Sequence, residues 1–267
     1  MRFLPILLLL AAVPMLAWEC PRCLSGNPDD AGYCSSCLLP LPPEGMTFIP
    51  GTTVEIEGEE FEVKGFFIDD TQVTYREFLP WLNGSGFGAR ELGAVITGGS
   101  TAESMEFLAF TPFMGDQAGG ITVPSQCLEN AVASITWSGA QSYLSSEGKR
   151  LPTLAELHAA NRAGLVQELD AYQAMSDFSG QMRASLGDML GTLATQAMFA
   201  GYSTARERVM WELTGTEYGE DPTDTAPAPG VIFVSIFKPG ETPELSAVNR
   251  DEGYFNVVFR GAIEVPE

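Results

Sequence analysis

The pattern of hydrophobic and polar residues changes several times along the chain. From residue 45 it reads GMTFIPGTTVEIEG and then, a few residues on, FEVKGFFIDD, where apolar residues form short β-rich runs broken by Gly and Pro-Gly. Runs of this kind are typical of short strands joined by turns. The pattern therefore predicts several short strands between residues 45 and 71, the last ending at Asp69 or Thr71.

Two segments that follow show the spacing of helices. Thr74 can cap the first helix, because a threonine hydroxyl accepts a hydrogen bond from an early helical N–H. The second helix is predicted over residues 138–146, with Gly148 ending it. The apolar side chains expected on or next to these helices are Phe78, Leu79, Leu82, Trp137, Ala140, Tyr143 and Leu144.

The stretch GKRLPTLAELHAANRAG, residues 148–164, predicts a third helix with a marked start and end. Thr153 and Glu156 have the spacing of a capping box, in which each side chain binds the backbone N–H of the other residue. Pro152 favours an extended chain before the cap, and Gly164 supplies a left-handed residue after the last turn. We expect a helix of about three turns. This pattern by itself indicates no function.

Residues 84–124 are rich in Gly, Ser and Thr and show little periodicity. An irregular segment of this length is uncommon in a compact domain unless it is functional or packed on itself. Trp81 and the aromatic residues of this insert are therefore candidates for ligand contact, whereas other large aromatics are expected in the core. The insert aromatics are Phe107, Phe110 and Phe113, and the core candidates are Trp137, Tyr143, Trp211 and Phe255.

Charge narrows the choice of partners. The 267 residues include 14 basic and 35 acidic side chains, which gives a formal net charge of −21. Such a surface repels polyanions, so we expect no nucleic-acid partner and no binding to anionic membranes. The acidic residues form short clusters rather than one long tail, which favours a solvated surface over a calcium site.

Residues 1–17, MRFLPILLLLAAVPMLA, have the three parts of a secretory signal: a positive start, an apolar run and a small final residue. The run is shorter than the roughly 20 residues of a spanning helix, and Pro14 interrupts it. We expect an exported protein that begins near Trp18 and resides in the periplasm, the cell envelope or outside the cell. Met15 is larger than the residue usual before a cleavage site, so retention as an anchor stays open. No other stretch of the sequence is predicted to cross a bilayer.

Four of the five cysteines lie in CPRCLSGNPDDAGYCSSC, with the spacing C-x2-C-x10-C-x2-C. Two such pairs on tight turns can converge on one tetrahedral zinc ion, which would be structural because four protein ligands leave no open position. In an oxidising compartment the same thiols could form two disulfides, and the spacing leaves both readings open. The residues concerned are Cys20, Cys23, Cys34 and Cys37.

This segment is similar to small zinc-ribbon modules, although Leu24 and Leu38 occupy places where such modules usually have Gly. We predict a zinc-ribbon-like four-cysteine module over residues 18–38, followed by a stiff, Pro-rich linker over residues 39–44. Further residues that match such modules are Asn27, Pro28, Ala31 and Tyr33.

Several motifs are spread over residues 45–264. FIPG at residues 48–51 opens this part, GKRLPTLAE at residues 148–156 lies near its middle, and RVMWELT at residues 208–214 follows later. Together they resemble the formylglycine-generating enzyme (sulfatase-modifying factor) family, with its F-I-P-G-G, G-K-R-L-P-T and G-N-V-W-E-W-T segments. The resemblance implies a C-type-lectin-like fold, an irregular and loop-rich α+β domain, which agrees with the short strands, helices and long connections predicted above. The family-motif residues are Trp137, Gly148, Lys149, Arg150, Leu151, Pro152, Thr153, Glu156, Trp211 and Glu212.

The resemblance also implies which groups an active member would need. The family's oxidase converts a substrate cysteine to formylglycine with two cysteines near its C-terminus, which bind copper(I) in the aerobic enzymes. This chain has no cysteine after Cys127. Val209 stands at the family's calcium-binding asparagine, and Asn256 stands at its closing arginine. We therefore expect neither the copper site nor the calcium site.

Other catalytic chemistry has few candidates. His158 is the only histidine, and we expect a solvated helix residue rather than a catalytic base. Cys127 is the candidate catalytic thiol, although a single exported cysteine is more often buried or paired with a partner chain. The carboxylates that could serve in glycoside cleavage are Asp69, Asp70, Glu212 and Asp251, and their spacing singles out none of them.

The sequence thus predicts an exported, non-catalytic domain that binds a protein, peptide or glycan ligand through its loop surface. The alternative is a divergent oxidase of the same family that modifies a cysteine or serine in a peptide. That alternative needs Cys127 as a redox thiol, and the missing second cysteine argues against it.

Overall fold

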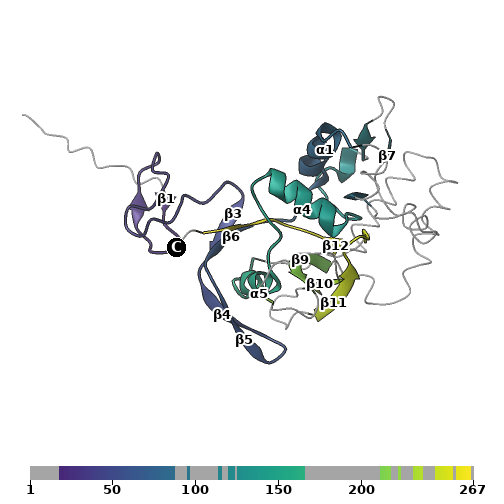
Figure 1. The fold of residues 1–267 in the computed structure, drawn as a ribbon. Helices are drawn as coiled ribbons and strands as arrows, with labels where there is room; N and C mark the ends of the chain where they lie inside the picture. Colours follow the sequence, from purple (N-terminus) through teal and green to yellow (C-terminus); the bar gives the residue numbers. More distant parts are fainter. Residues whose placement is uncertain are drawn as a thin grey trace, which may run out of the picture.

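The computed structural model describes residues 18–87, 95–96, 114–115, 120–123, 125–165, 211–217, 222–223, 231–236, 244–254 and 257–265. Short strands and helices alternate with long connections, so the predicted irregular α+β architecture is confirmed (Figure 1). The described strands before the first helix are β1 (Trp18–Glu19), β2 (Gly26–Asn27), β3 (Met46–Ile49), β4 (Thr52–Ile56), β5 (Glu59–Val63) and β6 (Phe66–Asp69). Then come α1 (Tyr75–Gly84), β7 (Met114–Gly115), β8 (Ile121–Thr122), the 3-10 turn η1 (Ser125–Cys127), α4 (Trp137–Ser146) and α5 (Leu154–Arg162). The remaining strands are β9 (Trp211–Glu217), β10 (Val231–Ile236), β11 (Glu244–Asn249), β12 (Val257–Val258) and β13 (Ala262–Glu264).

A three-stranded antiparallel sheet joins the beginning and the end of the main domain. β6 is its central strand, with β3 on one side and β13 on the other. Figure 1 shows the yellow C-terminal segment returning beside β3 and β6. The predicted strands between residues 45 and 71 are confirmed, and the last of them ends at Asp69.

The helix ends follow the capping residues predicted from the sequence. Thr74 caps α1, and the Thr153–Glu156 capping box starts α5. α4 begins at Trp137, one residue before the predicted start, because Thr136 is its N-cap. Gly148 and Gly164, placed after α4 and α5, have φ angles of +70° and +79°, in the left-handed region that glycine adopts freely.

α5 is a central helix and not a surface helix. It packs against the β4–β5 hairpin on one side and β9 on the other (Figure 1). Every residue from Leu154 to Ala160 is buried. His158 is 5% exposed, so the predicted solvated histidine is wrong. The capping pattern predicted the helix correctly, but it contained no information about the elements that surround it.

α1 and α4 pack around a cluster of aromatic rings. The Trp81 ring centroid lies 5.1 Å from that of Phe78 and 5.6 Å from that of Tyr143. Trp81 is half-buried in this cluster, so it has a packing role that its assignment as a ligand-contact residue did not anticipate. Trp137, Tyr143 and Trp211 are buried, as predicted for core residues. The other aromatic predictions lie outside the described residues: Phe107, Phe110, Phe113 and Phe255.

The first residues of the predicted linker over residues 39–44 pack against the four-cysteine module. Leu39 is fully buried, Tyr33 pairs with Pro40, and the Leu41 N–H donates to the Gly32 carbonyl at 2.9 Å. The chain therefore folds back on the module before it enters β3. Within the part of the chain that the structure describes, no helix has the length and apolar character needed to span a membrane.

Candidate metal centre

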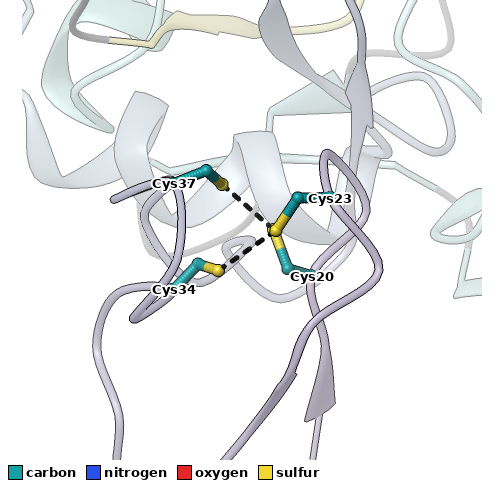
Figure 2. Close-up of side chains that lie close together, drawn as sticks. All are labelled: Cys20, Cys23, Cys34 and Cys37. Atoms are coloured by element: carbon teal, nitrogen blue, oxygen red, sulfur yellow. Dashed lines mark hydrogen bonds between the residues drawn. The ribbon is translucent and has the colours of Figure 1, made fainter.

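The four cysteines of residues 18–38 bring their sulfur atoms together. All four Sγ atoms lie within 4.8 Å of one another (Figure 2). Sγ–Sγ distances of 3.5 Å join Cys20 to Cys37 and Cys23 to Cys34, so each of these pairs links one turn to the other. A tetrahedral zinc ion with Zn–S bonds of about 2.3 Å places its sulfur ligands about 3.8 Å apart. The arrangement therefore fits one zinc ion in size and in ligand type.

Each cysteine pair lies on a tight turn. The Leu24 N–H donates to the Cys20 carbonyl at 2.8 Å, and the Leu38 N–H donates to the Cys34 carbonyl at 2.9 Å. Leu24 and Leu38 both have a φ of +60°. The backbone thus adopts the left-handed conformation that glycine would favour at these places, although the side chains are leucines.

Asn27 holds the two turns together. Its side chain is fully buried, and its Nδ2 donates to the Ser25 carbonyl at 2.9 Å in the first turn. Its Oδ1 accepts the Ser35 N–H at 3.0 Å in the second turn. The sequence match to zinc-ribbon modules included Asn27, but it did not indicate this bridging role.

The thiols of this cluster differ strongly in acidity. Burial acts to raise the pKa of Cys34, but hydrogen bonds from the backbone N–H groups of Cys37 and Ser36 outweigh it and lower that pKa to about 6. At Cys37 a hydrogen bond from the Leu39 N–H acts to lower the pKa of the thiol. Burial and the neighbouring sulfurs outweigh it and raise that pKa to about 12. The cluster therefore holds some thiolate charge, and a cation is needed before all four cysteines become ligands.

The environment of Cys127 differs from that of the four clustered cysteines. It is 1% exposed, ends η1 and packs in the same core as Phe78 and Tyr143. Burial raises the pKa of its thiol to about 11. The nucleophilic form of cysteine is the thiolate, so this environment suppresses reactivity. The structure places Cys127 as a core residue.

The motif residues around α5 form structural contacts. Both Arg150 terminal nitrogens bind the Glu156 carboxylate at 2.7 Å, and the same carboxylate accepts the Thr153 N–H at 2.8 Å. Lys149 Nζ lies 2.6 Å from Asp69 Oδ1. These bonds fix the start of α5 and tie the segment before it to the end of β6.

A buried ion pair, which the sequence analysis missed, links β9 to the C-terminal segment. Arg260 is 1% exposed and its guanidinium binds the Glu212 carboxylate, while Gln72 Nε2 donates to Glu212 at 3.4 Å. Arg260 also donates to the Asp69 carbonyl at 3.1 Å. The available signal was a single charge within the otherwise apolar run VVFRGAI.

Three of the four carboxylates considered for glycoside cleavage are used in structural contacts, and the fourth, Asp251, is exposed. Asp69 binds Lys149 and the Gly261 N–H, Glu212 binds Arg260, and Asp70 accepts the Thr47 hydroxyl at 2.5 Å. Burial raises the pKa of Asp69, an effect that its bonds to Lys149 oppose. An acid–base pair needs two carboxyl groups that face one substrate bond. The carboxylates of Asp69, Asp70 and Glu212 instead bind groups of the protein itself.

Comparison with known proteins gives one family match. Residues 40–205 match the model of the "Sulfatase-modifying factor enzyme 1-like domain". This range includes the GKRLPTLAE block and ends before the RVMWELT segment at residues 208–214. A search of curated proteins finds no match. A solved structure, "Crystal Structure of CarF", has a TM-score of 0.39 and 13% identity, covering 85% of this chain and 100% of that chain.

Proposed function

The chain belongs to the sulfatase-modifying factor enzyme 1-like domain family, and from that premise we propose that it is an exported, non-catalytic member. Its irregular α+β domain is the C-type-lectin-like fold that the motifs predicted. In this proposal the loop surface of the domain binds a protein, peptide or glycan ligand. The fold is retained, and the oxidase chemistry is not.

The observation that carries this proposal is the burial of Cys127. A formylglycine-generating oxidase needs two reactive thiols, and the four other cysteines of this chain belong to the N-terminal cluster. Cys127 is the remaining thiol, and its environment raises its pKa to about 11. A single thiol cannot hold copper(I) between two protein thiolates, and its burial keeps it from reaching a substrate thiol to form a disulfide.

Alkylation of the native protein tests this observation. We expect iodoacetamide at pH 8 to leave Cys127 unmodified in the folded chain and to modify it completely in denaturant, with mass spectrometry locating the label. The variant Ser145→Cys is the control, because Ser145 is exposed on α4 and a thiol there is accessible to the reagent. Rapid labelling of Cys127 in the native protein would restore the oxidase alternative.

The N-terminal module has a structural role in the same proposal. Four thiolates in tetrahedral reach of one another suit zinc, which would hold the two turns together without providing an open coordination position. Metal analysis combined with a thiol count tests this. We expect about one zinc per chain, whereas the absence of both zinc and free thiols would indicate two disulfides.

Export rests on the signal pattern of residues 1–17. We expect N-terminal sequencing of the protein recovered from the cell envelope or the medium to begin at Trp18. Recovery of the protein only from the cytoplasm with Met1 intact would contradict export.

A further inference from the structure

The four-cysteine module, residues 18–38, shares a hydrophobic core with the family domain. Cys20 and Cys34 are both fully buried, and so is Leu39, which follows the module. These three side chains form one cluster with the following residues of β3 and β6: Met46, Phe48 and Phe67. Cys37 packs against the same cluster, so three of the four cysteines are part of the packing between the module and the domain.

The surface that the module covers is one face of the β13–β6–β3 sheet. Phe48 and Phe67 pack edge to face with ring centroids 5.6 Å apart, and the Arg22 guanidinium lies 5.2 Å from the centre of the Phe48 ring. Ile263 of β13 joins the edge of the same cluster. The opposite face of the sheet carries Phe66 and Ile68, which pack with α5 in a separate cluster. The module is thus the cover of the face that α5 does not reach.

The module has few other means of holding this position. Its regular structure consists of two strands of two residues each. Segments of this size do not fold by apolar burial alone and depend on metal ions or disulfides. When a structural zinc ion is removed from such a module, the turns that present its ligands lose their fixed geometry. The buried positions of Cys20 and Cys34 depend directly on that geometry.

We propose that the four-cysteine site is a metal-dependent clamp on the family domain. With zinc bound, the module covers Met46, Phe48 and Phe67; on zinc removal, that face of the sheet becomes exposed and β3, β6 and β13 loosen. This inference rests on the zinc site of the proposed function. It adds that the metal controls the stability of a sheet that contains both the first and the last strand of the domain.

Hydrogen exchange of the full chain under reducing conditions tests the clamp. The variant Cys23→Ser removes a zinc ligand that is exposed and lies outside the shared cluster, so the substitution itself deletes no side chain from that cluster. Ser36→Ala is the matched control, because Ser36 is exposed on the other turn and its side chain is not a ligand. Zinc content and free thiols are measured in the same samples.

We expect Cys23→Ser to lose its zinc and to show exchange at least about tenfold faster in β3, β6 and β13. α5 is the internal reference, with exchange changed much less, and Ser36→Ala should resemble the unmodified chain. Loss of zinc with unchanged exchange in the three strands would overturn the clamp and make the module an independent unit. An unmodified chain without zinc would overturn the clamp and the zinc site together, whereas the non-catalytic proposal would stand, since it depends on Cys127.

Discussion

At the two cysteine-bearing turns, a leucine holds a backbone conformation that glycine adopts with less strain. Leu24 and Leu38 have φ angles of +60°, and their side chains are 71% and 75% exposed. A side chain with a Cβ atom costs roughly 1–2 kcal/mol in this region. Neither leucine gains burial in return, so the packing of the module does not explain their presence.

The first prediction concerns Leu38. We expect Leu38→Gly to stabilise the module by about 1 kcal/mol, because glycine removes the left-handed strain without removing a buried contact. Chelator competition for zinc, followed by thermal unfolding, measures the change. Leu41→Gly is the matched control: Leu41 is also exposed but has no positive φ, so glycine there should destabilise by roughly 0.5–1 kcal/mol. Equal losses in both variants would contradict the strain at Leu38.

The second prediction concerns His158. Burial lowers the pKa of this histidine to about 4, whereas an exposed imidazole in the unfolded chain titrates near 6.5. Between these values the unfolded state binds more protons, so the stability contributed by neutral His158 is present above about pH 6.5 and is lost as the pH falls towards 4. The expected slope is up to about 1.4 kcal/mol per pH unit.

Urea unfolding of the unmodified chain and of His158→Gln, at several values between pH 4 and 7, isolates this contribution. The variant should lack that part of the pH dependence, even if it is less stable at every pH. Identical pH slopes for the two proteins would show that His158 titrates alike in both states.

At the level of elements, local signals were readable in the sequence and distant contacts were not. Thr153 and Glu156 define the start of α5 because a capping box needs only four consecutive residues. The surroundings of α5 come from the β4–β5 hairpin and β9, which lie far away along the chain. For the same reason, neither the burial of His158 nor the contact between Arg260 and Glu212 could be predicted from local sequence patterns.

The Arg260–Glu212 pair provides the third prediction. Arg260→Met leaves the Glu212 carboxylate buried without its cation, so we expect a loss of about 3–5 kcal/mol in the free energy of unfolding. The double variant Arg260→Met/Glu212→Gln should recover part of that loss, because no unpaired charge remains. Urea unfolding measures both. A single variant within about 1 kcal/mol of the unmodified chain would show that the pair does not hold β9 to the C-terminal segment.

At the level of the whole molecule, the chain keeps the family residues that stabilise the fold and lacks the cysteines that the family's oxidase uses. Lys149, Arg150 and Glu156 are present and form the contacts that fix α5. The two active-site cysteines that the family has near its C-terminus are both missing, since the sequence has no cysteine after Cys127, and Cys127 itself is a core residue. The sequence could therefore predict the family and the four-cysteine cluster from short motifs. It could not predict that the cluster packs on the β13–β6–β3 sheet, because that contact joins segments from both ends of the chain.

We propose that this chain keeps the family scaffold without the family's oxidase activity. The most direct measurement incubates the zinc-loaded full chain with copper(I), oxygen and a cysteine-containing sulfatase peptide, and detects aldehyde in the peptide by mass spectrometry. An active formylglycine-generating enzyme serves as the positive control. We expect no aldehyde above that formed in the absence of protein. Aldehyde formed over repeated turnovers, and abolished by Cys127→Ser, would contradict it.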